Sequence, residues 1–558
     1  MDKYIKGVAC LCLLGLTGLT SCNDEWDSHY DGNGGVPEQS LMDLIRQDSR
    51  LEKFCQILEK TQEDTLLSST QTYTVWAPEN EALADVDMND MDGLRRLVRN
   101  HIARYTNPTS TPSDKRIYML NRKIMSFRDA DSFMGAEIEQ KNIPAQNGVL
   151  HVMKDQVPYL CNVLERMAGD PNYSKVYEFI MRWNRKQYDA GQSTPYDSVF
   201  VDYNPMLESY SYGIGLLDRE DSLYTMVIPD NAAWDAAMAR LKPYFVPGSN
   251  LTGDALTEYQ DSVSESKAGQ AILAGLTFPG RAFRDAEGNF QEPTRLDSLY
   301  TIDGHLLRKA DLQTYFNGYE REQASNGYVY LAKGHLNMAD TCTWNPTLEL
   351  EGEYYKTKDL AMTATMYVIG GESVLQGVTG NSYLEISATS NRVGITYEMP
   401  QVLAGKYAIM VDFVPPIING LNTKTRLQYE LTHLQEDGTL PRKPEVTFEE
   451  DNLIVQNPWM YEALADTDGS EEEGEDGGDV EEPIGKVGVV TQKVGEVEFP
   501  VADYYDGMWF YDERNANTVQ TVNTKLRILF NVASKELTDR TWERVARIDR
   551  VRLVPVLE

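Results

Sequence analysis

Two short segments each occur twice along this chain of 558 residues, and the repeat limits what the chain can fold into. Residues 73–80 read YTVWAPEN, and residues 224–231, 151 positions later, read YTMVIPDN. Residues 147–152 read NGVLHV, and residues 326–331, 179 positions later, read NGYVYL. Segments that recur in the same order indicate a duplicated structural unit. The larger second spacing predicts an insertion of about 28 residues within the second copy.

Each repeated segment has the pattern of a β-strand bounded by a turn or a proline. Pro78 and Pro229 end apolar runs, because proline has no N–H to donate to a neighbouring strand. We expect a helix to begin directly after each of these prolines. Asn-Gly at 147–148 and 326–327 supplies the positive φ of a tight turn, and the run that follows each pair is predicted to be a strand.

Apolar residues at helical spacing predict amphipathic helices around these strands, over 41–58, 94–102 and 160–180. With the strand segments, they indicate a mixed α+β fold for the first 338 residues.

The motifs of the first copy resemble those of the fasciclin (FAS1) domain. Residues 75–82 are similar to its first motif and residues 147–152 to its second. Residues 97–102 are similar to its central tyrosine–histidine stretch, with Asn100 in place of the tyrosine. The resemblance implies a FAS1-like domain over 38–157, a compact fold in which a twisted β-wedge is flanked by helices.

The second copy departs further from the family pattern. Ile228 stands where alanine is usual, Tyr330 replaces the histidine, and no central motif is visible. The resemblance implies a second, degenerate FAS1-like domain over 158–338 with an insertion. It also implies roles in adhesion and extracellular binding, with no shared catalytic machinery.

The motif residues that carry this resemblance are Pro78, Asn80, His101, Asn147, Gly148 and His151. The two histidines have two interpretations. They could form a pair that binds a ligand, or each could satisfy buried polar groups while packing in the core, which we favour. Tyr330 supports the structural interpretation, because the second copy keeps the turn without the imidazole.

The N-terminal segment has the pattern of a lipoprotein signal peptide over 1–21. Lys3 and Lys6 precede an apolar stretch that is too short to span a bilayer. It ends in Leu-Thr-Ser-Cys, similar to a lipobox, which predicts lipid attachment to the thiol of Cys22. An acidic, glycine-containing tether over 22–37 resembles the export signal of surface lipoproteins of the Bacteroidota outer-membrane type. We expect a lipid-anchored, surface-exposed outer-membrane protein.

The remaining cysteines do not indicate a metal site. Cys55, Cys161 and Cys342 are far apart in sequence, with no CxxC and no Cys/His cluster. We expect all three to be buried thiols, and we expect no metal and no cofactor.

The chain changes character after residue 338, where short β-branched and aromatic runs alternate with turns. At least seven strands are expected over 339–558, which favours an all-β sandwich or jelly roll. They are predicted at 362–369, 383–386, 393–397, 406–414, 426–431, 525–530 and 548–553. Two of these runs resemble strands of galactose-binding-like jelly rolls, a fold of many carbohydrate-binding modules, although a sandwich without a sugar site fits equally well.

Sugar binding would use exposed aromatic rings, and the candidates by sequence are Trp459, Tyr504, Tyr505 and Trp509. Within the same domain, residues 466–482 hold ten acidic and no basic side chains, which predicts a disordered surface loop.

Composition narrows the class of partner. The formal net charge is −34, from 52 Lys and Arg against 86 Asp and Glu, which argues against nucleic-acid binding. No nucleophile, metal or nucleotide motif is present, so we do not expect an enzyme. The sequence favours a non-enzymatic cell-surface lipoprotein for adhesion or for binding an extracellular glycan or protein. Alternatives are an accessory subunit of a starch-utilisation-type outer-membrane nutrient importer, and a glycan hydrolase.

Overall fold

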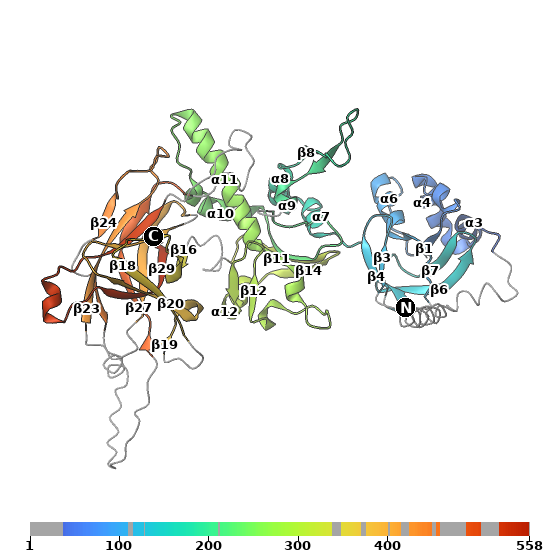
Figure 1. The fold of residues 1–558 in the computed structure, drawn as a ribbon. Coiled ribbons are helices and arrows are strands. Elements are labelled where there is room, and N and C mark those ends of the chain that lie inside the picture. The colour runs from blue at the N-terminus through green and yellow to red at the C-terminus, as the bar shows by residue number, and fades with distance from the viewer. Residues whose placement is uncertain are drawn as a thin grey trace, which may run out of the picture. The chain divides into compact units, whose positions relative to one another are not determined.

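The computed structural model describes residues 37–109, 115–127, 129–209, 213–337, 348–369, 375–399, 402–414, 423–448, 453–457, 487–503 and 524–556. The chain divides into two compact units (Figure 1). The first comprises Met1–Arg166 with Asp218–Leu223 and Gln323–Tyr328, and the second comprises Met167–Leu217, Tyr224–Glu322 and Val329–Glu558. The signal segment, the tether, Cys22, Cys342 and the acidic loop lie outside the described residues.

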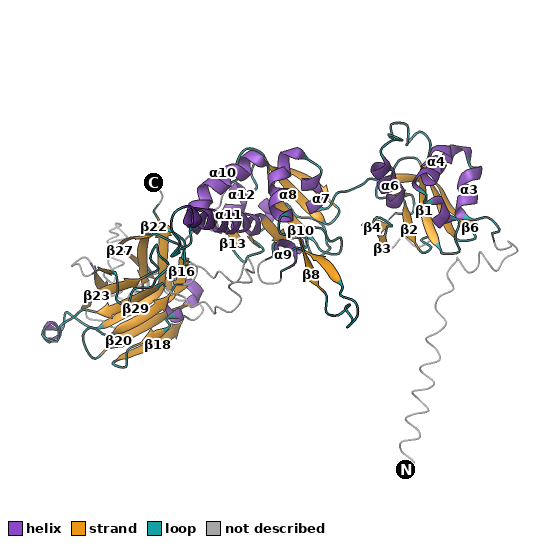
Figure 2. Ribbon diagram, turned by 90° about the horizontal axis from the view of Figure 1, so that it is seen from above, coloured by secondary structure: helices purple, strands orange, loops and turns teal. Residues whose placement is uncertain are grey.

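The first unit is a small sheet with helices on one face (Figure 2). Its strands run in the order β2-β1-β7-β6-β5, with β1 and β7 parallel. The strands are β1 (Tyr73–Pro78), β2 (Ile102–Arg104), β3 (Lys115–Tyr118), β4 (Ile124–Phe127), β5 (Ser132–Phe133), β6 (Ala136–Ala145) and β7 (Gly148–Met153). The helices are α3 (Leu41–Gln47), η1 (Ser49–Leu51), α4 (Glu52–Thr61), α5 (Asp64–Leu67) and α6 (Met91–Asn100), while α7 (Val163–Ala168) crosses the boundary between the two units.

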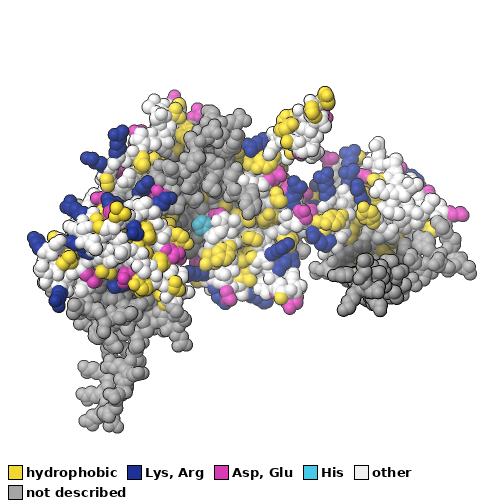
Figure 3. Space-filling model, viewed as in Figure 1, with side chains coloured by type: hydrophobic (Ala, Val, Ile, Leu, Met, Phe, Trp, Pro, Cys, Tyr) yellow, Lys and Arg dark blue, Asp and Glu magenta, His cyan; other side chains and the backbone are white. Residues whose placement is uncertain are grey.

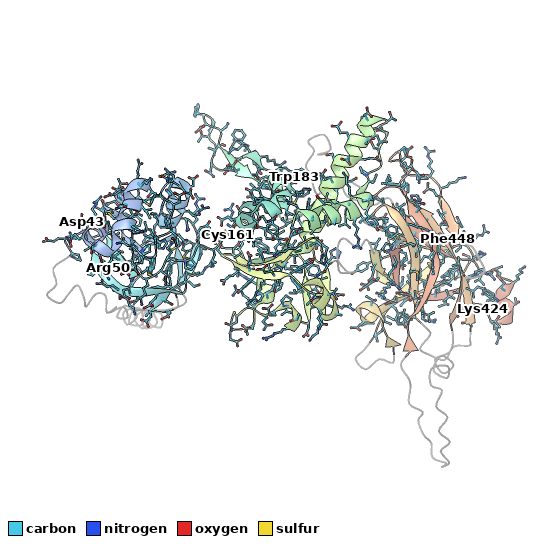
Figure 4. The ribbon with its side chains drawn as sticks, turned by 180° about the vertical axis from the view of Figure 1, so that it is seen from behind. Asp43, Arg50, Cys161, Trp183, Lys424 and Phe448 are labelled. Carbon is cyan, nitrogen blue, oxygen red and sulfur yellow. The ribbon has the colours of Figure 1, made fainter. Side chains whose placement is uncertain are left out.

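Alternation along β1 places its side chains in two separate cores. Val75 and Ala77 pack among residues of α3, α4 and α6, while Trp76 packs on the opposite face of the sheet with Phe127 and Phe133. Ser40 caps α3 through a reciprocal pair of hydrogen bonds with Asp43, which Figure 4 labels with Arg50 of η1. The helices predicted over 41–58 and 94–102 are present with different bounds: the first is divided into α3, η1 and α4, and the second, α6, ends at Asn100, so that Ile102 begins β2.

The second unit contains a sheet with the strand order β11-β10-β15-β14, which corresponds strand by strand to β2-β1-β7-β6 of the first unit. Its strands are β10 (Tyr224–Pro229), β11 (Thr277–Pro279), β14 (Glu320–Ala324) and β15 (Gly327–Ala332), the last two overlapping the first unit. The surrounding helices are η2 (Pro171–Tyr173), α8 (Ser174–Met181), α9 (Pro205–Glu208), α10 (Asn231–Leu241), η3 (Lys242–Phe245), α11 (Asp254–Leu276), η4 (Gly280–Phe283), η5 (Pro293–Arg295) and α12 (Lys309–Tyr315).

Two hairpins and a long helix occupy the extra length of the second copy. The 23-residue α11 and the hairpin β12 (Ser298–Tyr300) and β13 (Leu306–Arg308) lie between the two repeated segments. A further hairpin, β8 (Arg185–Tyr188) and β9 (Phe200–Tyr203), lies before the first of them.

The expectation of a helix directly after each proline is right for one copy and wrong for the other. After Pro229, Asp230 accepts a hydrogen bond from Ala233 N at 2.8 Å and starts α10. After Pro78, residues 80–85 form turns, and the next helix begins at Met91. The difference follows from the residue after the proline, because aspartate is a good N-cap and Glu79 has a longer side chain that is not favoured there.

The C-terminal part of the second unit is two six-stranded sheets that share one core. The first sheet runs β18-β20-β29-β22-β27 with β16 on β29, and the second runs β17-β21-β28-β23-β24 with β25 on β23. All seven predicted strands are present. The strands are β16 (Leu348–Glu351), β17 (Thr357–Lys358), β18 (Met362–Val368), β20 (Ser382–Ala388), β21 (Gly394–Glu398), β22 (Gly405–Phe413), β23 (Thr423–Thr432), β24 (Val446–Phe448), β25 (Ile454–Asn457), β27 (Val490–Phe499), β28 (Lys525–Phe530) and β29 (Val545–Pro555), with the pair β19 (Leu375–Gln376) and β26 (Val487–Gly488) apart.

Residues 244–249 join these sheets to the helical part of the second unit through backbone hydrogen bonds. Tyr244 O accepts from Ala404 N at 2.8 Å, and Val246 O accepts from Ala502 N at 2.8 Å. Ser249 N donates to Glu436 O at 3.0 Å. Residues on both sides of the expected boundary at 338/339 therefore belong to one compact unit.

The first unit also encloses a charged cluster. The ammonium of Lys123, a residue 3% exposed, contacts Glu165 and Glu220 at 2.6 Å each. It also donates to Ser325 Oγ at 3.1 Å. The segments Asp218–Leu223 and Gln323–Tyr328 are thereby anchored beside residues 115–127 of the same unit.

Removing the Lys123 ammonium is predicted to open this cluster, because its two carboxylates would lose their buried counter-ion. We expect Lys123→Met to reduce the local opening free energy of residues 218–223 and 323–328 by about 3–5 kcal/mol, measured by native-state hydrogen exchange. Lys154→Met removes an exposed ammonium and is the matched control, with little expected change. Equal effects of the two substitutions would contradict the prediction.

Candidate functional site

The side chain of Asn147 connects three segments that are far apart in sequence. Its Oδ1 accepts from Leu41 N at 2.8 Å, at the start of α3, and its Nδ2 donates to Leu67 O and Ser69 O at 2.7 Å each. Its own carbonyl accepts from Tyr73 N at 3.0 Å, where β1 begins. Asn147 is buried, so its polar groups and those of its partners lose their solvation, and these hydrogen bonds compensate for that loss.

Asn326 makes the equivalent bonds in the second copy. Its Oδ1 accepts from Val163 N at 3.0 Å, at the start of α7, and its Nδ2 donates to Arg219 O at 3.1 Å, before β10. The two asparagines therefore have the same structural role.

Asn80 and Asn231 form a second equivalent pair. Asn80 Oδ1 accepts from Lys53 N at 2.8 Å and its Nδ2 donates to Ser49 O at 2.8 Å. Asn231 Oδ1 accepts from Lys175 N at 3.0 Å and its Nδ2 donates to Pro171 O at 3.0 Å. In both copies, the asparagine two residues after the strand-ending proline bonds a short 3₁₀ helix and the first turn of the helix that follows it.

Gly148 and Pro78 fit positions that few other residues could occupy. Gly148 has φ of +146°, and a Cβ atom there would lie 1.8 Å from Tyr73 O. Pro78 is buried and ends β1, and the next N–H, that of Glu79, donates to Met153 O at 2.9 Å. Both residues set the register of β1 against β7.

His101 is buried and uses both ring nitrogens on the backbone. Nδ1 lies 2.8 Å from Leu97 O, and Nε2 accepts from Val157 N at 2.9 Å. The only tautomer that fits both contacts is neutral, with the proton on Nδ1. Burial lowers the pKa of His101 to about 4.

His151 is also buried and neutral, but its proton is on Nε2 and not on Nδ1. Nδ1 accepts from Asn142 N at 3.3 Å, and Nε2 donates to Asn107 O at 3.1 Å. Its ring stacks on that of Trp76 with centroids 5.6 Å apart. Burial also lowers its pKa to about 4.

The two histidines do not share a site. His101 lies beside Phe54 in the core under the helices, whereas His151 lies with Trp76 on the other face of the sheet. The second copy has Tyr330 at the position of His151, and this phenol is buried beside Phe316. The arrangement supports the structural interpretation of both imidazoles over a ligand-binding pair.

The other predicted residues have mixed outcomes. Trp459, Tyr504, Tyr505 and Trp509 lie outside the described residues, so their role stays a prediction. Cys55 and Cys161 are half-buried, which corrects the expectation of buried thiols: Cys55 packs against the margin of the core, and Cys161 lies in the loop before α7.

The sequence reasoning missed exposed aromatic residues in two places. Tyr188, Tyr196 and Phe200 are exposed on the β8–β9 hairpin, which Figure 3 shows covered by hydrophobic side chains. Tyr367 is exposed on β18 and stacks on Tyr383 of β20. For Tyr367 the available signal was the strand-forming run at 362–369, which also fits a strand with no ligand.

Two kinds of feature are absent from the part of the chain that the structure describes. No group of three or more His, Cys, Asp or Glu side chains there is arranged to hold a metal ion. Every helix in the same residues is too short or too polar to cross a membrane.

Residues 49–157 match the family model described as the Fasciclin domain. The chain therefore contains a FAS1 domain in its N-terminal part. No curated protein matches the chain.

Solved structures with local likeness include a FAS1 domain pair and carbohydrate-binding modules. A FAS1 domain pair from the insect cell adhesion molecule Fasciclin I is 14% identical, with a TM-score of 0.19, over 52% of this chain and 97% of that one. A CBM35 from Paenibacillus barcinonensis is 14% identical, with a TM-score of 0.15, over 37% and 98%. The CBM22 tandem of Xyn10C from the same organism is 10% identical, with a TM-score of 0.19, over 38% and 46%. TM-scores this low do not establish a shared fold.

Truncating Asn147 is predicted to loosen the first unit, because one buried N–H and two carbonyls lose their partner. We expect Asn147→Ala to reduce the opening free energy of residues 41–47 and 67–73 by about 2–4 kcal/mol, measured by hydrogen exchange. Asn172→Ala removes an exposed amide that donates to Asp170, and it should change the opening free energy of these residues by less than about 0.5 kcal/mol. Normal protection in Asn147→Ala would show that these bonds are dispensable.

Acid is predicted to destabilise the first unit through its histidines. In the unfolded state both histidines bind a proton below about pH 6.5. In the folded state their pKa values are about 4, so His101 and His151 stay neutral until the pH is much lower. Stability therefore falls as pH drops from about 6.5 towards 4, by about 2 kcal/mol per histidine at pH 5. Hydrogen exchange of β1 and β7 between pH 7 and pH 5, corrected for intrinsic rates, measures this. His151→Gln should reduce the dependence, and a flat profile in the parent protein would refute it.

Proposed function

We propose that this protein is a lipid-anchored extracellular binding protein of the adhesion type, and not an enzyme. In this proposal, acyl chains on Cys22 hold it on the outer face of the outer membrane, and the acidic tether extends the folded units away from the lipid. The bound partner is an extracellular glycan or protein.

The FAS1 domain over 49–157 is the observation that carries this proposal. Its polar motif side chains are fully engaged in holding the fold: the two imidazoles bond the backbone, and the two asparagine amides join separate segments. A general base needs a titratable nitrogen within reach of a substrate, and these histidines are buried and neutral. The motif is therefore a scaffold, and recognition belongs to exposed surfaces.

The shared core of the two C-terminal sheets supports a second binding module in the same chain. We propose that it is a jelly roll and that the repeat before it is a second FAS1-like domain, consistent with the equivalent bonds of Asn147 and Asn326. An adhesion protein built this way presents several surfaces on one anchored chain.

Anchoring is tested with Cys22→Ser in the bacterium that makes the protein. We expect the variant to lose palmitate labelling and to leave the membrane fraction, while Cys55→Ser, the matched control, keeps both. Protease added to intact cells should cleave the parent protein. Full protection of the parent, or a membrane-bound Cys22→Ser, would refute the proposal. Co-purification with a transporter would instead favour the importer alternative.

A further inference from the structure

The outer faces of the two C-terminal sheets differ in chemistry. Side chains on these faces alternate with those that enter the shared core. In the second sheet the outer face is occupied by paired charges: Arg527 contacts Asp359 and Glu430, and Lys525 contacts Glu398. Such a face is well solvated and satisfies its own charges.

The outer face of the first sheet also has paired charges, such as Asp412 with Arg550 and Arg552, and in addition it holds an aromatic pair. Tyr367 of β18 lies directly opposite Tyr383 of β20, and their rings stack with centroids 5.5 Å apart and planes 18° apart. Tyr383 is 7% exposed and Tyr367 is 43% exposed. The inner ring therefore supports the outer one, which remains open to solvent at the sheet edge.

An ion pair lies next to these rings on the same face. Glu385 is two residues from Tyr383 along β20 and lies opposite Arg547 of β29. Arg547 Nε lies 2.8 Å from a Glu385 carboxylate oxygen. The Nη1 atom of Arg547 is enclosed and has no hydrogen-bond acceptor among the residues that the structure describes. A buried donor without an acceptor is unusual enough to require an explanation.

The pair is also electrostatically coupled to the rings. Burial is the main cause of the raised pKa of Tyr383, while Arg547 lowers it and Glu385 raises it. Because Tyr383 and Glu385 are neighbours on the outer face of β20 and each lies opposite its partner, the aromatic pair and the ion pair form one continuous patch.

We propose that Tyr367, Tyr383, Glu385 and Arg547 form a binding site for a pyranose ring of a neutral glycan. An aromatic ring stacks on the C–H face of a sugar, the carboxylate accepts a hydroxyl hydrogen, and the guanidinium donates to a sugar oxygen. The ion pair is balanced in charge and the chain carries a net charge of −34, so a neutral sugar fits better than a uronic acid. This inference rests on the proposed binding function and names one ligand class for it.

The test uses the full mature protein in affinity gel electrophoresis with soluble galactomannan, xylan, xyloglucan and mixed-linkage β-glucan, and with polygalacturonate as the acidic probe. We expect retardation by at least one neutral polysaccharide and none by polygalacturonate. Tyr367→Ala should weaken that retardation about tenfold, and Tyr367→Phe should retain it. Tyr300→Ala removes another exposed tyrosine of the same unit and should leave it unchanged.

Folding of each variant is checked by its thermal unfolding midpoint, which should match the parent, since Tyr367 is at an exposed edge. Retardation that is unchanged in Tyr367→Ala would overturn this site and leave the binding function standing. No retardation by any polysaccharide, together with attachment of producing cells to protein-coated surfaces, would overturn the glycan assignment alone. Loss of both, with protection from protease on intact cells, would overturn the proposed function as well.

Discussion

The hydrogen bonds of the Asn147 side chain are the interaction on which the first unit depends. One amide joins the start of α3, the loop before β1 and the turn into β7, so three segments separated by up to 106 residues meet at one buried group. Without this group, the backbone polar atoms of those segments would be buried without partners. The adjacent Gly148 is needed for the same close approach of the turn to β1, since only a residue without Cβ can lie against Tyr73 O.

The same device occurs in the second copy even though its sequence has diverged. Asn326 and Gly327 keep the amide bridge and the positive φ, while the histidine at the next strand position has become Tyr330. Both copies therefore keep the backbone connection, whereas the core position holds an imidazole in one copy and a phenol in the other. This contrast explains why the repeat is visible in the sequence at its turns and prolines and is weak between them.

Much of the fold could be predicted from these local rules. The seven C-terminal strands, the helices around β1 and the repeated strand-turn units follow from periodicity and from the conformational limits of proline and glycine. The missing helix after Pro78 could not be predicted from the repeat, because it depends on whether Glu79 or an aspartate follows the proline. The burial of Lys123 was also hidden, since its partners Glu165 and Glu220 come from distant parts of the sequence. The candidate site was predictable to the same extent. The sequence identifies the motif residues, but only the folded sheets place His101 and His151 on opposite faces and stack Tyr367 on Tyr383.

The distribution of polar groups separates scaffold from recognition in this protein. In the FAS1 domain the motif asparagines and histidines have their hydrogen-bonding capacity used inside the fold, so they contribute stability that depends on pH but offer no free group to a ligand. On the first C-terminal sheet, the ring of Tyr367 is not used in this way and stays open to solvent. Binding free energy comes from groups whose interactions improve when the partner arrives, and a fully satisfied motif cannot supply it. Recognition should therefore be sought on the sheets rather than in the motif that identifies the domain.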